Sequence, residues 1–358
     1  MSKQVHYNID RLNKENANYN LIIGEKSNGK SYQVKHKEGI EHFLNDKMKF
    51  WLLRRWKADI TTIWLEKYFS DVNIEKYTNN EFNYISSFRR EIFLSKINED
   101  KKVKRGYSIG YYSALSEEQH FSGGSFLDVD RIIFEEFMER GAYLFHEEEK
   151  LQYFYSTIDR KRGTTKMYLL GNTITRVCPY LKAWGLDDVL KEMKQGEIRT
   201  KEIDNDGTKV KLAIELCSSS GGKNMAIGNV AKAINKGAWQ SDKQPKLEKS
   251  RKKYNNIFRF GFDFKGFKFL CDVIIDTEEK EKFGFFIYPY KGIFSEKMLV
   301  FTDKIMLNPL RQTNIYDITL NNKSLKDLLG YFKSDKIFYS DDLTGTEFKQ
   351  VINFEIRR

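Results

Sequence analysis

Cysteine and proline are scarce in this sequence of 358 residues, which has three cysteines and four prolines. Cys178, Cys217 and Cys271 lie far apart and form no C-x-x-C pair, so the sequence indicates neither a disulfide framework nor a cysteine zinc site. We expect three buried, reduced thiols, as in a cytosolic protein. Because so few prolines mark boundaries, these must be read from glycine, serine and charge.

Membrane and metal patterns are missing as well. No apolar run is long enough to cross a membrane, and the polar N-terminus does not look like a signal peptide. The five histidines form no H-E-x-x-H motif, and His146, which precedes three glutamates, is expected at the surface. Positive charge, in contrast, is abundant: 61 Lys and Arg against 50 Asp and Glu give a formal net charge of +11. This excess favours a polyanionic partner, although charge alone does not separate DNA from RNA or a membrane surface.

The first part of the chain alternates between strand-like and helix-like segments. Apolar residues at helical spacing predict a helix over 31–46. Five short apolar runs are typical of buried strands: 19–23, 49–56, 106–115, 131–136 and 166–172. This rhythm predicts an α/β domain whose mostly parallel sheet carries helices on both faces.

The length of the chain suits two domains. The best break is the glycine- and serine-rich stretch 217–224, after a predicted hairpin with Asp206-Gly207 as its turn. We therefore expect a first domain over 1–217, a linker over 218–253 that contains a short helix, and a C-terminal domain over 254–358. The aromatic-rich, alternating sequence of this last part predicts β-strands.

The residues between the first strand and the first helix match G-x-x-x-x-G-K-[ST] at every fixed position. In this motif the glycines let backbone N–H groups curl around phosphate oxygens, Lys30 reaches the β- and γ-phosphates, and Ser31 ligates Mg²⁺. The helix that follows points its positive end at the same anion. We therefore expect ATP and Mg²⁺ here, with a chance match in a glycine-containing turn as the alternative. The residues expected to contact the nucleotide are Gly24, Glu25, Lys26, Ser27, Asn28, Gly29, Lys30 and Ser31.

Two acids end another predicted strand. Glu135 and Glu136 follow an apolar run, and ligands of open α/β sheets bind at the carboxyl ends of the strands. We predict that Glu135 is the acid on the metal side and that Glu136 polarises the attacking water. Aspartate is the usual first acid, and the longer glutamate would contact Mg²⁺ through a water. A surface acidic pair at a helix start is the alternative.

Two other stretches fit the same chemistry. The strand over 166–172 ends at Asn172, where a polar residue would sense the γ-phosphate, although a plain strand-to-loop turn explains it equally well. The turn before that strand carries Arg160 and Arg162, and an arginine that enters a neighbour's active site stabilises transition-state charge. A solvated basic turn or a DNA contact is the alternative, and the sequence does not separate the two arginines.

Five segments follow one another in an order that resembles one family. They read HYNIDRLNKENANYNLIIGEKSNGKS, FWLLRRWK, DRIIFEEF, TIDRKR and YLLGNTITRVCPYL. Together they resemble the DNA-packaging ATPases of small podophages of the phi-twenty-nine type, which are motors like the terminase large subunit. The more specific parts are LRRWK and LLGNT, whereas Cys178-Pro179-Tyr180 stands where the family tends to have Asn-Pro-Tyr.

The resemblance implies an ASCE-type ATPase domain in which Glu136 is the catalytic acid and Lys30 and Arg160 complete the catalytic set. Arg160 corresponds to the arginine that acts in the neighbouring subunit, and Lys57 to a second such position. The resemblance further implies a homo-oligomeric ring of five copies that docks on the capsid portal in the host cytoplasm and drives double-stranded DNA into the procapsid. A membrane is not among the expected partners. Family members also dock on a packaging RNA, and the sequence does not tell whether this chain does.

Larger packaging motors carry an RNase H-like nuclease after the ATPase domain, and it needs clustered carboxylates for two metals. The candidates are Asp263, Asp272 and Asp276; even spacing puts the last two on one face of a strand, but nothing places Asp263 beside them. The resemblance implies a vestigial, inactive nuclease. From Lys236 to Lys268, ten Lys or Arg stand against three Asp or Glu, and we expect this face to grip nucleic-acid phosphates, with a solvated linker as the alternative.

Three other functions stay open at this point. The chain can be another DNA-dependent ATPase, such as a helicase or a DNA-transfer motor. It can be a packaging enzyme with an active C-terminal nuclease. It can also be a basic nucleic-acid-binding protein whose phosphate-binding loop no longer acts.

Overall fold

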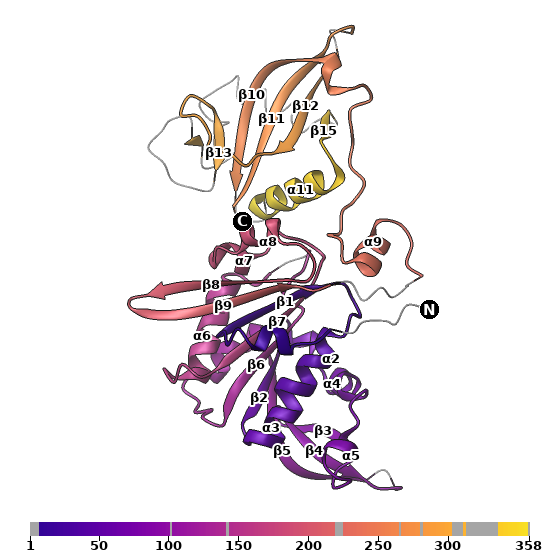
Figure 1. The fold of residues 1–358 in the computed structure, drawn as a ribbon, viewed down its shortest axis with the longest axis vertical. Helices are drawn as coiled ribbons and strands as arrows, with labels where there is room; N and C mark the ends of the chain where they lie inside the picture. The colour runs from indigo at the N-terminus through magenta and orange to yellow at the C-terminus, as the bar shows by residue number, and fades with distance from the viewer. Residues whose placement is uncertain are drawn as a thin grey trace.

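Two β-sheets organise the computed structural model, which describes residues 7–100, 102–140, 143–218, 225–264, 266–279, 282–302, 311–312 and 336–356 (Figure 1). The larger sheet is built from strands before residue 217 and the smaller from strands after residue 253. Residues 219–224 of the expected break, Lys265 of the basic stretch, and 303–310 and 313–335 of the expected C-terminal domain lie outside the described residues. In the part of the chain that is described, no helix has the length and apolar character of a membrane span.

The larger sheet has nine strands in the order β3-β4-β5-β2-β6-β7-β1-β9-β8, and the six from β5 to β9 run parallel. Its strands are β1 Tyr19–Gly24, β2 Lys49–Arg54, β3 Tyr84–Phe88, β4 Glu91–Ile97, β5 Val103–Ala114, β6 Val129–Glu135, β7 Lys166–Asn172, β8 Glu197–Asn205 and β9 Thr208–Leu216. The five apolar runs predicted as strands are β1, β2, β5, β6 and β7, so the mostly parallel sheet is confirmed.

Helices cover both faces of this sheet, as predicted. Val34 and Ile40, on the first long helix, are buried in the core of one face, and Leu151 and Phe154 are buried in the core of the other. The helices are α1 Asp10–Asn13, α2 Lys30–Val34, the π-helix η1 Lys35–Glu41, α3 His42–Asp46, η2 Lys57–Asp59, α4 Thr62–Phe69, α5 Ile74–Tyr77, η3 Leu115–Phe121, α6 Glu147–Asp159, α7 Pro179–Ala183 and α8 Asp187–Glu192.

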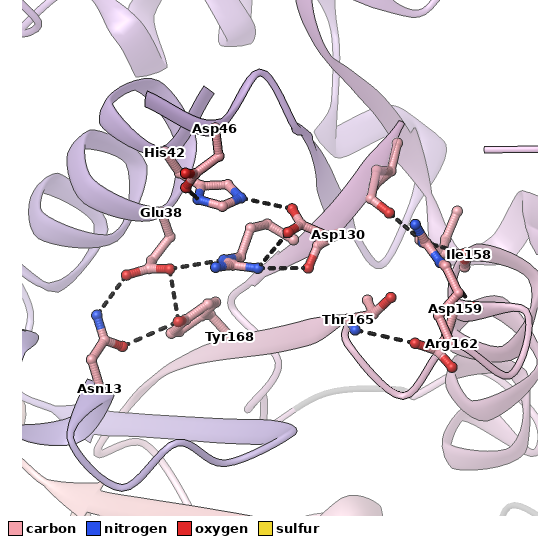
Figure 2. Close-up of polar contacts among 12 residues, drawn as sticks. Asn13, Glu38, His42, Asp46, Asp130, Ile158, Asp159, Arg162, Thr165 and Tyr168 are labelled. Carbon is pink, nitrogen blue, oxygen red and sulfur yellow. Dashed lines mark hydrogen bonds and ion pairs between the residues drawn. The ribbon is translucent and has the colours of Figure 1, made fainter. Parts of the chain in front are cut away.

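A buried polar cluster fixes the continuous helix formed by α2, η1 and α3 to strands β6 and β7 (Figure 2). Glu38, in the π-helical segment, accepts hydrogen bonds from Arg131 Nε (3.0 Å), the Tyr168 hydroxyl (2.7 Å) and Asn13 Nδ2 (2.6 Å). Arg131 and Tyr168 lie within the first three residues of β6 and β7, so this cluster occupies the amino ends of the strands. The carboxyl ends, where open α/β sheets bind their ligands, are left to the site described below.

Two hairpins extend the parallel sheet at its edges. The predicted hairpin is confirmed: Asp206 and Gly207 both have positive φ (50° and 85°), as a two-residue turn between β8 and β9 requires. Strand β9 also pairs in parallel with β1, which places this hairpin in the main sheet rather than outside it. At the other edge, β3 and β4 form an antiparallel hairpin beside β5 that the sequence analysis did not anticipate.

The smaller sheet has six strands in the order β14-β13-β10-β11-β12-β15. Phe262 and Phe269 are buried on its inner face and contact Phe348 of the last helix with ring centroids 5.0 and 5.3 Å apart. The elements after the larger sheet are α9 Asn229–Lys236, η4 Arg251–Lys253, β10 Tyr254–Phe264, β11 Phe267–Asp276, β12 Phe283–Pro289, β13 Val300–Thr302, β14 Arg311–Gln312, β15 Ile337–Tyr339 and α11 Asp342–Ile356. The expected short helix and the β-rich C-terminal part are therefore both present.

Candidate nucleotide-binding and catalytic site

The loop between β1 and α2 has the backbone that a phosphate cradle needs. Gly29 has φ of 95°, a conformation that favours glycine, and α2 begins at the next residue, Lys30. Gly24 closes β1 so tightly that an added Cβ would lie 2.7 Å from Asn28 Nδ2 and 2.8 Å from Cys217 Cβ. Both glycines therefore suit the close packing and the positive φ of this loop, as the phosphate-binding motif requires.

Lys30 is a buried cation whose amine donates to three neutral oxygens. Its Nζ donates to the Glu25 carbonyl (2.7 Å), Asn28 Oδ1 (3.1 Å) and Asn172 Oδ1 (3.2 Å). Burial lowers the pKa of Lys30, which means that the surrounding protein does not fully compensate its charge. A site with this deficit fits an anion such as a nucleotide phosphate.

Glu135, the last residue of β6, lies beside the start of α2. One carboxylate oxygen accepts from the Ser31 hydroxyl at 2.9 Å, and the other accepts from the Tyr68 hydroxyl at 2.7 Å. Burial raises the pKa of Glu135, and these two hydrogen bonds oppose that rise. A hydroxyl and a carboxylate at this distance form an oxygen donor set of the kind that Mg²⁺ prefers, so the residues present fit the metal.

Glu136 follows in a left-handed backbone conformation, with φ of 57°. This turn directs its half-exposed carboxylate toward β2, where Arg54 Nη2 lies 2.9 Å from Glu136 Oε2. Arg54 is the last residue of β2, and its guanidinium also packs over the Trp64 ring. The second acid of the pair is therefore held by an ion pair within the same chain.

These side chains surround one cavity of about 680 Å³ at the carboxyl ends of the parallel strands. Gly24 and Glu25 of the predicted set lie behind its wall, where Glu25 supplies the carbonyl that holds Lys30. The cavity is lined by Lys26, Ser27, Asn28, Gly29, Lys30, Ser31, Tyr32, Gln33, Glu135, Glu136, Leu170, Gly171 and Asn172. The structure thus gathers the predicted loop, both acids and the predicted sensor Asn172 at a single site.

The two arginines that could enter a neighbour's active site, Arg160 and Arg162, differ in their surroundings. Arg162 is built into the fold: its guanidinium donates to the carbonyls of Asp159, Leu127, Ile158 and Val129, and Figure 2 shows it folded against the end of α6. Arg160 is exposed, donates to the Gly123 and Gly124 carbonyls, and lines a separate surface hollow. Neither residue lines the nucleotide cavity of its own chain.

Lys57, the second candidate for a trans contact, follows β2 and is 75% exposed. Its Nζ lies 3.1 Å from Glu117 Oε1, so it too is placed at the surface rather than in the cavity.

The three C-terminal aspartates do not come together. Asp272 pairs with Arg251 (2.8 Å) and Arg259 (2.6 Å), and Asp276 pairs with Lys249 (2.9 Å). Asp263 stands opposite Lys268 in the β10–β11 ladder, whereas Asp272 stands opposite Arg259, four residues away. Across the described ranges, the three acids form no group able to hold a metal, and part of the basic stretch is already neutralised by acids of its own sheet.

Sequence reasoning missed two residues of the site, Arg54 and Tyr68. Arg54 ends a strand that neighbours β6 in parallel, so the rule about strand ends could have found it. Tyr68 reaches Glu135 from α4, and no motif or spacing in the sequence points to that contact.

The order β6-β7-β1 places one strand between the strand of the phosphate-binding loop and the strand that carries the two acids. Together with the cavity, this defines a P-loop nucleotide-binding protein of the ASCE type. Residues 1–281 match the family model described as Podovirus DNA encapsidation protein (Gp16), and the chain belongs to this family.

Relatives and solved structures agree with this assignment. The DNA packaging proteins of Bacillus phages phi29 and PZA are each 25% identical to the chain over 189 residues, which cover 52% of this chain and 52% of each relative. The match thus spans about half the length of these curated relatives. The fold is similar to that in the bacteriophage Phi-29 viral genome packaging motor assembly (TM-score 0.57, 19% identity, 99% of each chain) and the Phi-28 gp11 DNA packaging motor (TM-score 0.50, 15% identity, 98% of each chain).

Proposed function

We propose that this protein hydrolyses ATP and uses the energy to move double-stranded viral DNA through the portal into a preformed capsid. The observation that carries the proposal is the single cavity that combines Lys30, Ser31, Glu135 and Glu136 at the carboxyl edge of the sheet. Membership of the DNA encapsidation family and the DNA packaging proteins among the relatives support the choice of DNA as the cargo.

Binding of the triphosphate falls to the loop and to Lys30. The backbone N–H groups around Gly29 hold phosphate oxygens, and Lys30 exchanges its neutral oxygen partners for the β- and γ-phosphates. Ser31 and Glu135 are the residues that would hold Mg²⁺, which neutralises charge on the same phosphates.

Hydrolysis falls to Glu136, which lines the cavity and accepts the proton of the attacking water. The ion pair with Arg54 fixes the direction of its carboxylate. Asn172 contacts the amine of Lys30 and is placed to report whether the γ-phosphate is present.

A neighbouring copy supplies the positive charge that stabilises the transition state. Arg160 is exposed and away from the cavity of its own chain, so it is available to a neighbour in a homo-oligomeric ring of five copies. The ring docks on the portal of the procapsid in the host cytoplasm, with a packaging RNA as a further partner. In this proposal residues 1–217 form the ATPase domain, 218–253 the linker, and 254–358 a vestigial RNase H-like domain that binds nucleic acid.

The test compares two variants with the parent protein. Glu136→Gln keeps the size of the side chain but cannot take a proton, and we expect it to bind ATP while its DNA-stimulated phosphate release falls about a hundredfold or more. Lys30→Ala is expected to lose both binding and hydrolysis. Hydrolysis by Glu136→Gln at the parental rate would contradict the assignment, and unwinding of a forked duplex by the parent would favour a helicase instead.

A further inference from the structure

The turn between β3 and β4 consists of two arginines in an unfavourable backbone conformation. Phe88 and Glu91 pair across the hairpin, and the two residues between them, Arg89 and Arg90, have φ of 47° and 69°. Such turns favour Asn-Gly, because few side chains tolerate positive φ. Arginines retained where the backbone disfavours them point to a use for their charge.

The side chains around this turn form an exposed cationic and aromatic surface. The Phe88 ring, which is 46% exposed, contacts two guanidinium groups, those of Arg89 (5.1 Å from the ring centroid) and Arg105 (4.5 Å). No carboxylate of the described residues lies within ion-pair distance of either of these two arginines. Two rigid guanidinium forks are thus left free to bind an anion.

This surface lies toward the edge of the sheet that carries the nucleotide cavity. Arg90 pairs with Glu117 at 2.9 Å, and Lys57, which follows the carboxyl end of β2, pairs with the same carboxylate at 3.1 Å. Arg54, the last residue of β2, contacts Glu136 of the cavity. A line of cations therefore leads from the catalytic acid to the β3–β4 turn.

The rest of the hairpin repeats the excess of positive charge. Lys96 and Lys104 stand directly opposite each other in the β4–β5 ladder, where like charges destabilise the pair. Residues 84–107 contain seven Lys or Arg (89, 90, 96, 101, 102, 104, 105) and three Asp or Glu (91, 99, 100). A polyanion would relieve this repulsion.

We propose that the surface formed by Phe88, Arg89 and Arg105 binds the phosphate backbone of duplex DNA. This inference rests on the proposed function, because it takes DNA as the polyanion. Guanidinium forks bind phosphate oxygens in two-point contacts without reading the base sequence, as a protein that moves any DNA requires. The contact is made by the ATPase sheet itself, apart from the C-terminal basic stretch.

The experiment replaces Arg89 by Asn, which suits the turn better and removes one charge. A fluorescein-labelled duplex is titrated with the full-length chain at several salt concentrations, and thermal melting is followed in parallel. Arg89→Asn is expected to melt no lower than the parent, to bind DNA several-fold more weakly, and to reduce the slope of log K against log salt by about 0.9, one phosphate contact. Arg89→Lys, which keeps the charge, should retain most of the affinity.

The matched control is Lys209→Asn, which removes an exposed cation from the β8–β9 hairpin at the opposite edge. Unchanged DNA affinity and salt slope in Arg89→Asn would overturn the inference. An equal loss in the control would also overturn it, because Arg89 would then contribute to DNA binding no more than any other exposed cation. A loss of affinity for duplex RNA alone would overturn the choice of partner. If the parent neither binds duplex DNA nor hydrolyses ATP, the proposed function itself falls, so the two failures are distinguishable.

Discussion

At the scale of single residues, the contact between Tyr68 and Glu135 compensates for an unusual acid. A glutamate is one methylene longer than the aspartate expected beside Mg²⁺, and its carboxylate has more positions available. The Tyr68 hydroxyl holds one oxygen of Glu135 at 2.7 Å, which leaves the other facing Ser31. The backbone of Tyr68 is also fixed, because Lys35 Nζ donates to the Tyr68 carbonyl and pairs with Asp71. In the proposed function, Tyr68 is therefore a positioning residue for the metal side of the site.

This contact predicts a specific defect in Tyr68→Phe. Hydrogen bonds to charged groups contribute about 1.5–3 kcal/mol, so loss of the hydroxyl should raise the Mg²⁺ concentration needed for half-maximal binding of a fluorescent ATP analogue about tenfold or more. Binding in EDTA should not change, because the phosphate loop is untouched. Tyr77→Phe is the matched control, since Tyr77 also donates to a glutamate, Glu41, away from the cavity. The same Mg²⁺ dependence in both variants would refute the role of Tyr68.

At the scale of elements, the start of α6 is joined to the end of β2 by a buried ion pair. Glu147, the first residue of α6, is fully buried and lies 2.8 Å from Arg55 Nε. Arg55 also donates to the carbonyls of Glu136 (3.3 Å) and Phe137 (2.7 Å), so it supports the backbone just after β6. Without the charge of Glu147, Arg55 keeps its contact with the half-exposed Glu139 (3.0 Å), but the buried side of its guanidinium loses its carboxylate. Breaking a buried pair in this way costs more than the pair itself contributes.

We therefore predict that Glu147→Gln lowers the free energy of unfolding by about 3 kcal/mol, measured by urea denaturation. The control is Glu149→Gln in the same turn, where an exposed carboxylate pairs with the exposed His146 and the change should stay below about 0.5 kcal/mol. If the two variants unfold at the same urea concentration, the ion pair does not hold α6 in place.

The elements also separate what the sequence can predict from what it cannot. β1, β2 and β6 are apolar on both faces, so their strands and the loop and acids at their ends could be read from local sequence. The β3–β4 hairpin was missed because its turn is Arg89-Arg90 rather than a typical turn sequence. Arg54 and Tyr68 were missed because 82 and 67 residues separate them from the acids they contact, and only the packing of β2 and α4 brings them there.

At the scale of the whole molecule, a short segment after β7 connects the nucleotide cavity to the smaller sheet. Asn172 contacts Lys30 in the cavity, and three residues later Thr175 Oγ1 bonds Gln350 of α11 at 2.6 Å. Arg176 forms an ion pair with Glu347 of the same helix at 2.6 Å, and Val177 is buried in the core of the smaller sheet. If Asn172 senses the γ-phosphate as proposed, a change there can be transmitted to the C-terminal part through the six residues 172–177.

This connection predicts that Arg176→Ala separates hydrolysis from movement of DNA. The residue lies outside the cavity, so DNA-free phosphate release should stay within about twofold of the parent, while the additional rate produced by duplex DNA and the packaging of DNA should fall about tenfold, the size of one lost coupling contact. The control is Arg199→Ala on β8, which removes a partly exposed arginine that also pairs with a glutamate, and it should package normally. Exchanging the partners, Arg176→Glu with Glu347→Arg, should recover part of the DNA response, because the ion pair is restored with reversed charges. DNA stimulation at the parental level in Arg176→Ala would mean that this ion pair does not couple the two sheets. Another contact of the same segment, the hydrogen bond from the Gln240 backbone N–H to the Thr173 carbonyl (3.0 Å), would then be the next to test.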